Sequence, residues 1–506
     1  MTPLRGAASI GSGLAPAREP RPIRAGESIH VVGVAGAGAS AAALLAHRAG
    51  ARVTGCDPGG PSPYTPPLEA AGIEMQWGHS ADHLSRPPIP ERLAVTKALT
   101  AVDPDNAELV AARAASVPLE SWQQVIADAA VGRTLVGVAG THGKSTSAGW
   151  LVHVLTTAGL DPSAFVGALL PADLAGGLAS TARWGGGRAF VVEADEYAGN
   201  FDPYRPDLAV LTSAEWDHPD VFADRAAVID AFASWLRRAA RAVASPTVVA
   251  NVGDAGVAEV VELLREWPGE VLRVGLTDGP PRGAGADAYL TGAIVGADAS
   301  GTVVELRGRA LRAPRTVHLA LAGRHNAANA VGVAAAALRL GVPENELAAG
   351  LGSFVGVGRR LERKGEGRGV VVYDDYGHHP TAIAATLAAI RQLEPGRRIW
   401  AVYEPLTYHR TAALLEEFAE VLATADAVAI ADIWASRDPD TTITSAAILA
   451  QATARRRPGL QSVAPGTVEQ TAAWLAGQVR PGDAVLVMGG GKSYRIAELL
   501  VRALAG

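Results

Sequence analysis

The sequence predicts an α/β protein with three domains. Apolar, strand-like runs alternate with helix-like segments along the chain, and several of these runs end in glycine-rich turns or carboxylates. Strands that alternate with helices pair in mostly parallel sheets. The 506 residues, 48% of them hydrophobic, are enough for two to four domains with separate cores. We place the three domains at residues 28–131, 132–357 and 358–506.

The first of these domains begins with a strand, a glycine-rich turn and a helix. We expect Ile29–Gly33 to form a buried strand, residues 39–49 a helix, and Arg52–Asp57 a second strand. This order is typical of a Rossmann-like domain, in which Asp57 would accept a hydrogen bond from a ribose hydroxyl. A turn at the strand end accounts for Asp57 equally well. The glycine loop alone would also suit an NAD-dependent oxidoreductase.

The second domain contains the most specific motif of the chain. Gly140-Thr-His-Gly-Lys-Ser-Thr146 follows the apolar run Thr134–Val136 and precedes a helix-like segment from residue 148. In this context glycines let backbone N–H groups converge on phosphate, and the helix N-terminus adds positive potential. Lys144 would reach the β- and γ-phosphates, and the Ser145 hydroxyl would bind Mg²⁺. The motif therefore predicts an ATP site on a mostly parallel, P-loop ATPase-like sheet, with a simple helix-capping turn as the alternative.

Two further strand ends in this domain carry groups that bind metal ions. Glu193 ends an apolar run as part of Glu-Ala-Asp-Glu, and His218 follows the run over residues 208–212. In open α/β sheets, ligands bind at the carboxyl ends of strands, and Mg²⁺ near a γ-phosphate needs hard oxygen ligands. We expect Ser145 and Glu193 to hold one ion and His218 to serve a second. A solvated strand end is the alternative explanation of the acidic run.

Two asparagines lie at the start of a predicted helix in the second domain, and two histidines follow a predicted strand in the third. Asn326 and Asn329 begin a helix and lie on one face of it, where Asn326 could equally be a cap. His378 and His379 follow a buried strand that ends in two aspartates, a costly arrangement unless it is used. Arg410 follows another strand and could bind a carboxylate or phosphate.

Charge and composition argue against several classes of function. With a net charge of −6 and a pI near 6.1, the chain has no general attraction for nucleic acid or an anionic membrane. No apolar run is long enough to span a bilayer, so we expect no membrane insertion. Cys56 is the only cysteine, which excludes an intramolecular disulfide and suits a reducing compartment. Residues 1–27 lack the apolar core of a signal peptide, so we expect a disordered tail and a cytoplasmic protein.

Taken in order, these motifs resemble those of the Mur ligase family, the ATP-dependent amide-forming enzymes of peptidoglycan synthesis. The likeness extends from about residue 29 to 501 and includes Gly-Thr-His-Gly-Lys-Ser-Thr, Glu-Ala-Asp-Glu, His-Asn-x-x-Asn, Arg-Arg-Leu-Glu and Asp-Asp-Tyr-Gly-His-His-Pro-Thr. It implies an N-terminal domain for a UDP-sugar, a central ATP domain, and a C-terminal Rossmann-like domain for the incoming amino acid and for closure. The most similar branch joins L-alanine to UDP-N-acetylmuramate through an acyl phosphate, with ATP and Mg²⁺.

The resemblance also implies roles for single residues. Lys144, His218, Arg360 and Asp375 would be catalytic. The implied ATP site comprises Gly140, Thr141, His142, Gly143, Lys144, Ser145, Thr146, Asn326, Asn329, Arg360 and Asp375, and the implied metal ligands are Ser145, Glu193 and His218. The UDP-sugar would lie against Gly36, Ala37, Gly38, Asp57 and Thr96, and the amino acid against His378, His379 and Arg410.

Some segments depart from that branch. Thr96-Lys-Ala-Leu99 stands where the branch usually has Ser-Ser-Ala-Ile, which affects the expected UDP contacts. Residues 193–197, residues 215–222 and Glu404-Pro405 are more similar to a branch that attaches a whole tripeptide to UDP-N-acetylmuramate during recycling. A recycling ligase and a non-catalytic paralogue that only binds nucleotide-sugar therefore stay open as alternatives. A monomer and a homodimer are both compatible with the sequence.

Overall fold

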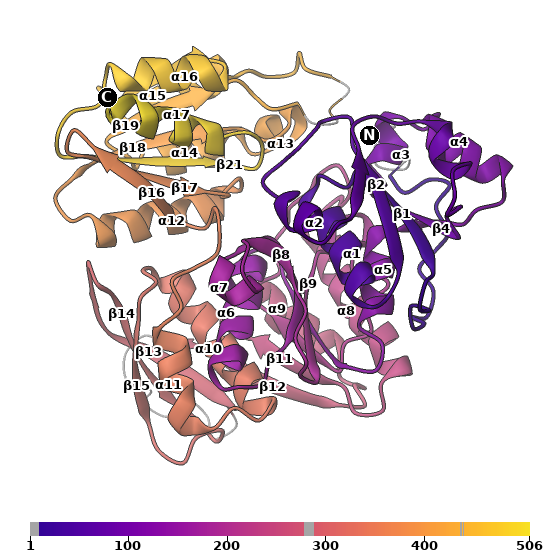
Figure 1. Cartoon of the computed structure of the whole chain (residues 1–506). Coiled ribbons are helices and arrows are strands. Elements are labelled where there is room, and N and C mark those ends of the chain that lie inside the picture. Colours follow the sequence, from indigo (N-terminus) through magenta and orange to yellow (C-terminus); the bar gives the residue numbers. More distant parts are fainter. Residues whose placement is uncertain (1–9, 278–287, 436–437, 439, 506) are drawn as a thin grey trace.

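The computed structural model describes residues 10–277, 288–435, 438 and 440–505. It contains three sheets, and the N-terminal and C-terminal domains both lie against the central one (Figure 1). The predicted α/β class with three domains is confirmed. The proposed domain boundaries, at 131/132 and 357/358, fall between the sheets. Among the described residues, no helix combines the length and apolar character that crossing a membrane needs.

The N-terminal sheet is parallel and has the order β3-β2-β1-β4-β5, the arrangement of a Rossmann fold. Successive side chains of β1 alternate between its faces. Ile29 and Val31 pack with α1 and α5, whereas Val32 packs with Leu109 of α4 on the opposite face. The elements are β1 (Ser28–Val32), α1 (Ala37–Arg48), β2 (Arg52–Cys56), α2 (Pro66–Ala70), β3 (Glu74–Gln76), η2 (Ala81–Leu84), β4 (Arg92–Val95), α3 (Lys97–Val102), α4 (Ala107–Ala114), β5 (Leu119–Ser121) and α5 (Trp122–Ala129).

The central sheet has ten strands in the order β15-β14-β13-β12-β11-β10-β6-β9-β7-β8. From β13 to β7 all neighbours are parallel, and β14, β15 and β8 add antiparallel edges. Helices α6 and α10 cover one face, and α8 and α9 cover the other. The elements are β6 (Thr134–Ala139), α6 (Lys144–Thr157), β7 (Ser163–Leu170), α7 (Ala172–Ala175), β8 (Ser180–Arg183), β9 (Ala189–Ala194), η3 (Tyr197–Gly199), β10 (Leu208–Leu211), α8 (Arg225–Ala242), β11 (Thr247–Asn251), α9 (Ala255–Leu263), β12 (Glu270–Thr277), β13 (Leu290–Asp298), β14 (Gly301–Arg307), β15 (Arg315–Leu319), α10 (Arg324–Arg339) and α11 (Glu344–Gly352).

The C-terminal sheet has the order β16-β17-β21-β18-β19-β20, with only the edge strand β16 antiparallel. Helix α12 lies between this sheet and the central domain (Figure 1). The elements are β16 (Glu362–Gly367), β17 (Val370–Asp375), α12 (Pro380–Leu393), β18 (Arg398–Glu404), α13 (Tyr408–Ala413), α14 (Leu415–Leu422), β19 (Ala427–Ala431), α15 (Ala446–Arg456), β20 (Gln461–Gly466), α16 (Val468–Ala476), β21 (Asp483–Gly489) and α17 (Tyr494–Ala505).

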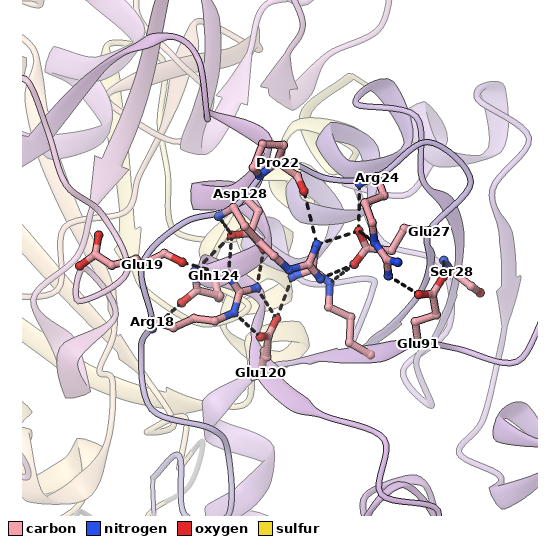
Figure 2. Close-up of polar contacts among 12 residues, drawn as sticks. Arg18, Glu19, Pro22, Arg24, Glu27, Ser28, Glu91, Glu120, Gln124 and Asp128 are labelled. Carbon is pink, nitrogen blue, oxygen red and sulfur yellow. Dashed lines mark hydrogen bonds and ion pairs between the residues drawn. The ribbon is translucent and has the colours of Figure 1, made fainter. Parts of the chain in front are cut away.

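The N-terminal segment differs from the disordered tail that we expected over residues 1–27. Residues 1–9 lie outside the described part, but residues 10–27 run along the N-terminal domain. Arg18 is 2.7 Å from both Glu120 and Asp128 (Figure 2). Composition could not reveal these contacts, because Glu120 and Asp128 follow Arg18 by 102 and 110 residues.

A fully buried arginine lies at the centre of this ionic cluster. Arg92 of β4 is 2% exposed and lies 3.1 Å from Glu27, 2.8 Å from Glu120 and within 2.5 Å of Asp128. Arg21 adds a 2.6 Å contact to Glu27. Because buried carboxylates are costly without positive partners, these arginines hold the N-terminal segment, β4 and α5 together.

Replacing Arg92 with Met is expected to destabilise the N-terminal domain by about 3–5 kcal/mol, because three buried carboxylates lose a shared partner. Urea unfolding followed by tryptophan fluorescence measures the change. Arg265→Met is the control: Arg265 is 80% exposed and pairs with Glu262 on the surface, so its loss should cost about 0–1 kcal/mol. Equal effects of the two substitutions would contradict a central role for Arg92.

The same cluster predicts a dependence of stability on pH. Burial raises the pKa of Glu27, but hydrogen bonds from Arg21 and the Arg24 N–H, with the charge of Arg92, outweigh burial and lower the pKa to about 2. An unfolded glutamate titrates near 4.5, so this stabilisation is complete above that pH and is lost as the pH falls towards 2. Glu27→Gln should therefore flatten the acid-side fall in unfolding free energy, measured by urea titrations, whereas the exposed Glu19→Gln should keep the wild-type slope.

Candidate active site

A cavity of about 1050 Å³ lies where the three domains meet. The loops that open into it follow the carboxyl ends of parallel strands in all three sheets, as expected for α/β folds. Of the predicted site residues, Ala37, Gly38, Thr141, His142, Gly143, Lys144, Ser145, Thr146, Glu193, His218, Asn326, Asn329, Arg360, Asp375, His378, His379 and Arg410 line the cavity. Gly36, Asp57, Thr96 and Gly140 are not among its lining residues.

The glycine loop before α6 is tightly packed between its neighbours. Gly140 and Gly143 both have positive φ, at 138° and 79°. A Cβ on Gly140 would lie 2.2 Å from the Thr212 hydroxyl oxygen, and one on Gly143 would lie 2.6 Å from Oδ1 of Asn329. Both the backbone angles and the space therefore demand glycine, and the loop leads directly into the N-terminus of α6.

Lys144 begins α6 and is held by groups of the same edge. Its Nζ donates to the carbonyl of Gly140 at 2.6 Å and to Glu196 at 2.9 Å, and Asp195 lies 3.6 Å away. Burial lowers the pKa of Lys144, but the charges of Glu196 and Asp195 outweigh burial and raise the pKa above its ordinary value. The ammonium group therefore stays charged beside the loop at neutral pH.

Ser145 and Glu193 form a pair beside Lys144. The Ser145 hydroxyl donates to Oε1 of Glu193 at 3.0 Å, and the other carboxylate oxygen accepts from the Gly167 N–H at 2.6 Å. Arg360 of the C-terminal domain donates to the Ser145 hydroxyl at 2.9 Å. Two hard oxygen groups beside a phosphate loop suit Mg²⁺, so Ser145 and Glu193 fit that ion.

His218 belongs to a different group of side chains. One ligand atom each of His218, Asp195 and Glu196 lie within 4.8 Å of one another. His218 itself has a positive φ of 56°, a conformation that is rare outside glycine. The three predicted metal ligands thus fall into two places, with Ser145 and Glu193 in one and His218 in the other.

A buried ion pair joins the C-terminal domain to this edge of the central sheet. Arg410 is 4% exposed and lies 2.7 Å from Asp217, and its Nη2 lies 3.0 Å from Nδ1 of His218. Burial raises the pKa of Asp217, but the charges of His218 and Arg410 outweigh burial and hold it well below its ordinary range. The Arg410 charge is therefore already paired with the central domain.

Two histidines of the C-terminal domain lie next to this pair. His379 is 3.9 Å from Glu215, which also contacts Nε2 of His142 at 3.0 Å. Burial lowers the pKa of His379 to about 4, and burial likewise lowers the pKa of His378 well below 6.5. Both rings are therefore neutral near pH 7 and can accept as well as donate hydrogen bonds.

Asp375 and Asn326 form hydrogen bonds with nearby backbone groups. Asp375 accepts from the backbone N–H groups of Leu361 and Gly377 at 2.8 and 2.7 Å, which fixes the segment that carries Arg360. Gly323, and not Asn326, caps α10, since the Asn326 amide donates back to the Ala322 carbonyl at 2.8 Å. The capping explanation of Asn326 is therefore wrong.

On the N-terminal side, the glycine loop after β1 contributes Ala37 and Gly38. A Cβ on Gly38 would lie 2.2 Å from the ring of Trp122, so this glycine allows close packing. Asp57 accepts a hydrogen bond from the N–H of Ala35 at 3.2 Å and so helps to fix the conformation of this loop. Thr96 is the N-cap residue of α3, but its hydroxyl donates to the carbonyl of Val32 at 3.5 Å and not to the helix.

The structure also shows residues that the sequence did not single out. Glu196 pairs with Lys144, and Glu215 contacts His142 and His379. Both residues belong to motifs at the ends of strands, so the sequence indicated that they lie near the site. It did not indicate which side chains they contact. Lys97 donates to the carbonyls of Ala198 and Gly199 at 2.9 Å each. These bonds join residues 96–99, the segment that differs from the family pattern, to the central domain.

Comparison with known proteins follows the same division into domains. Residues 28–134 match the Mur ligase family catalytic domain, residues 138–337 the Mur ligase middle domain, and residues 359–491 the Mur ligase glutamate ligase domain. A UDP-N-acetylmuramate–L-alanine ligase of Gloeobacter violaceus is 36% identical over 487 residues, covering 95% of this chain and 97% of its own. One from Mycobacterium sp. strain JLS is 36% identical over 484 residues, covering 94% and 95%.

Solved structures share the three-domain fold. A UDP-N-acetylmuramate-alanine ligase from Thermotoga maritima has a TM-score of 0.75 at 23% identity, covering 94% of this chain and 98% of its own. A murein peptide ligase from Psychrobacter arcticus has a TM-score of 0.68 at 24% identity, covering 95% and 99%. These two likenesses concern the fold alone. With 36% identity to curated relatives over nearly its whole length and all three domains matched, the chain belongs to the Mur ligase family of ATP-dependent, amide-forming ligases.

Proposed function

We propose that this chain joins L-alanine to the carboxylate of UDP-N-acetylmuramate, with conversion of ATP to ADP and phosphate, in the synthesis of peptidoglycan precursors. One observation carries the proposal: a phosphate loop, a Rossmann-type glycine loop and a C-terminal segment with Arg410 all face one cavity of about 1050 Å³. Relatives that are 36% identical over nearly the whole chain bear the name of this reaction.

The reaction needs two successive substitutions. The muramyl carboxylate attacks the γ-phosphate of ATP, which gives an acyl phosphate and ADP; the amine of alanine then attacks the acyl carbon and expels phosphate. Backbone N–H groups of the loop from Gly140 to Ser145 bind phosphate oxygens, and Lys144 neutralises their charge. Glu196 and the Gly140 carbonyl orient the Lys144 ammonium for this role.

Ser145 and Glu193 would hold Mg²⁺ beside the phosphates, because their oxygens are neighbours at 3.0 Å and lie next to the loop. The ion would supply positive charge to the transferred phosphoryl group. His218, with Asp195 and Glu196, offers a second place of the same kind. Asn326 and Asn329 lie beside this edge, with Asn329 packed against Gly143.

The C-terminal domain completes the site in this arrangement. Arg360 reaches the Ser145 hydroxyl and Arg410 reaches Asp217, so both arginines cross from one domain to the other. Such a contact shields an acyl phosphate from water, which would otherwise hydrolyse it. His378 and His379, neutral at pH 7, face the cavity and are suited to accept a proton from the attacking amine.

A tripeptide acceptor is the second candidate. A UDP-N-acetylmuramate:L-alanyl-γ-D-glutamyl-meso-diaminopimelate ligase from Neisseria meningitides is 28% identical, with a TM-score of 0.54 over 66% of this chain. Glu404, in the segment that is similar to the recycling branch, is buried at the end of β18, and burial raises its pKa to about 7.

Phosphate release separates these candidates. With ATP and Mg²⁺, the purified protein should release phosphate only when UDP-N-acetylmuramate and L-alanine are both present, because each step needs one of them. Glycine and serine test the size of the pocket. Release with the tripeptide and not with alanine would assign the chain to recycling, and no release with any acceptor would indicate a paralogue that only binds nucleotide-sugar.

Lys144→Ala should lower the rate of phosphate release by about 10²–10³-fold, the usual effect of losing one charge-stabilising group at a reacting centre. The matched control is Lys364→Ala, since Lys364 pairs with Glu362 at 3.0 Å in β16 and does not line the cavity. The control should keep wild-type turnover. Wild-type turnover of Lys144→Ala, in a protein with unchanged circular dichroism, would refute the assignment of the phosphate loop.

A further inference from the structure

A second cluster of metal-binding side chains lies inside the N-terminal domain, away from the central cavity. It consists of His30 on β1, Cys56 at the end of β2, His83 in η2 and Glu108 in α4, and one ligand atom of each lies within 4.8 Å of the others. None of the four lines the cavity between the domains. The proposed reaction gives them no role.

The cluster is enclosed between the sheet and α4. His30 and Cys56 point to the face on which Val32 packs against α4, as the alternation along β1 and β2 requires. The side chains of His30, His83 and Glu108 are 2%, 6% and 0% exposed, and Cys56 is fully buried. Polar and ionisable groups in such a place are costly unless they are satisfied by partners or by a metal ion.

The Glu108 carboxylate is the centre of the cluster. The Cys56 sulfur lies 3.0 and 3.1 Å from its two oxygens, and Nδ1 of His83 lies 2.9 Å from Oε1. Nε2 of His30 lies 3.3 Å from Oε2, yet it makes no hydrogen bond with any described residue. A buried imidazole nitrogen is thus aimed at the other three ligand atoms without a hydrogen-bond partner of its own.

These separations are close to those of a tetrahedral metal site. Zinc–nitrogen and zinc–sulfur bonds of about 2.0–2.3 Å place neighbouring ligand atoms about 3.3–3.7 Å apart. The contacts of Glu108 with Cys56, His83 and His30, at 2.9–3.3 Å, would therefore need to lengthen by only a few tenths of an ångström, and the other pairs of ligand atoms lie within 4.8 Å. Cysteine, histidine and glutamate are also the ligand types that zinc combines in proteins.

Charge balance favours a divalent ion. A thiolate from Cys56 and the carboxylate of Glu108 supply two negative charges, and two neutral histidines complete the set, so a divalent ion leaves the buried site neutral. Neighbouring residues hold two of the ligands in place. Nδ1 of His30 lies 2.7 Å from the Thr54 hydroxyl, which directs Nε2 into the cluster, and the Ser80 N–H donates to Glu108 at 3.1 Å.

We propose that His30, Cys56, His83 and Glu108 form a structural zinc site in the N-terminal domain. His79 lies at its rim, 15% exposed and 3.2 Å from Glu108, and shares the His-x₃-His spacing with His83 that is common among zinc ligands. The ion fastens η2 and α4 to the carboxyl half of β1 and β2. It thereby supports Asp57, the residue after Cys56, which holds the glycine loop at Ala35.

Cobalt substitution tests the site in the full-length protein without any substitution. Because Cys56 is the only cysteine, a thiolate-to-cobalt charge-transfer band in the near ultraviolet can arise only from this residue. Titration of metal-free protein with Co²⁺ should produce the band with one equivalent of metal, and Zn²⁺ should abolish it. Visible cobalt absorption without the charge-transfer band would place the metal elsewhere, for example at the ATP site, and would overturn the proposal.

Two variants and a control check the ligand set. Cys56→Ala should lose the charge-transfer band altogether, and His83→Gln should weaken cobalt binding at least about tenfold. His153→Gln, a histidine on α6 bonded to Ser353, should bind cobalt as the wild type does. Metal-free protein should also melt at a lower temperature than the zinc form. If zinc raises the melting temperature of Cys56→Ala as much as that of the wild type, the cluster is only a hydrogen-bonded group and the proposal fails.

This proposal is independent of the proposed ligase reaction. The cobalt band reports on Cys56 alone, whereas phosphate release reports on the Lys144 loop, so failure of either test leaves the other standing. Glu193→Gln separates them directly: it should impair phosphate release and leave the charge-transfer titration unchanged.

Discussion

The buried contact between Arg410 and Asp217 sets the arrangement of the active site. Both side chains are about 5% exposed or less, and each belongs to a different domain. Separating them would leave an uncompensated charge in a poorly solvated place, which is strongly unfavourable. The ion pair therefore helps to hold the C-terminal domain in place, together with the contacts of Arg360 with Ser145 and of His379 with Glu215.

Contacts of a different kind hold the N-terminal domain. Lys97 donates to two backbone carbonyls of the central domain. Burial lowers the pKa of Lys97 by more than the charges of Asp202 and Asp195 raise it. Carbonyl groups bind a cation more weakly than a carboxylate at 2.7 Å does. The N-terminal side thus combines this lysine contact with a hydrophobic core that α1 and α5 share with Phe165 and Phe190 of the central sheet. Lys97 of the segment over residues 96–99 therefore makes a contact between domains.

Much of the fold could be predicted from sequence because its signals are local. The Lys144 loop combines glycines, a lysine and a helix start within seven residues, and β1, β2 and β17 are visible as apolar runs with polar ends. Contacts between residues far apart in the chain have no comparable local signal in the sequence. Nothing near Arg18 indicates Glu120, and nothing near Arg410 indicates Asp217, because each partner comes from a distant part of the chain. His30 and His83 form no sequence motif with Cys56 either, since the packing of η2 against β1 and β2 brings them together.

The segment over residues 10–27 acts as a ligand that is permanently attached to its own receptor. Arg18 pairs with Glu120 and Asp128, in the way that a basic peptide would bind acidic side chains of a receptor (Figure 2). Covalent linkage gives such a peptide an effective concentration of about millimolar or more, so weak individual contacts are enough to keep it bound. Supplied separately, the same peptide would have to pay the full entropic cost of association. A stretch without helix or strand can therefore be a fixed part of the domain.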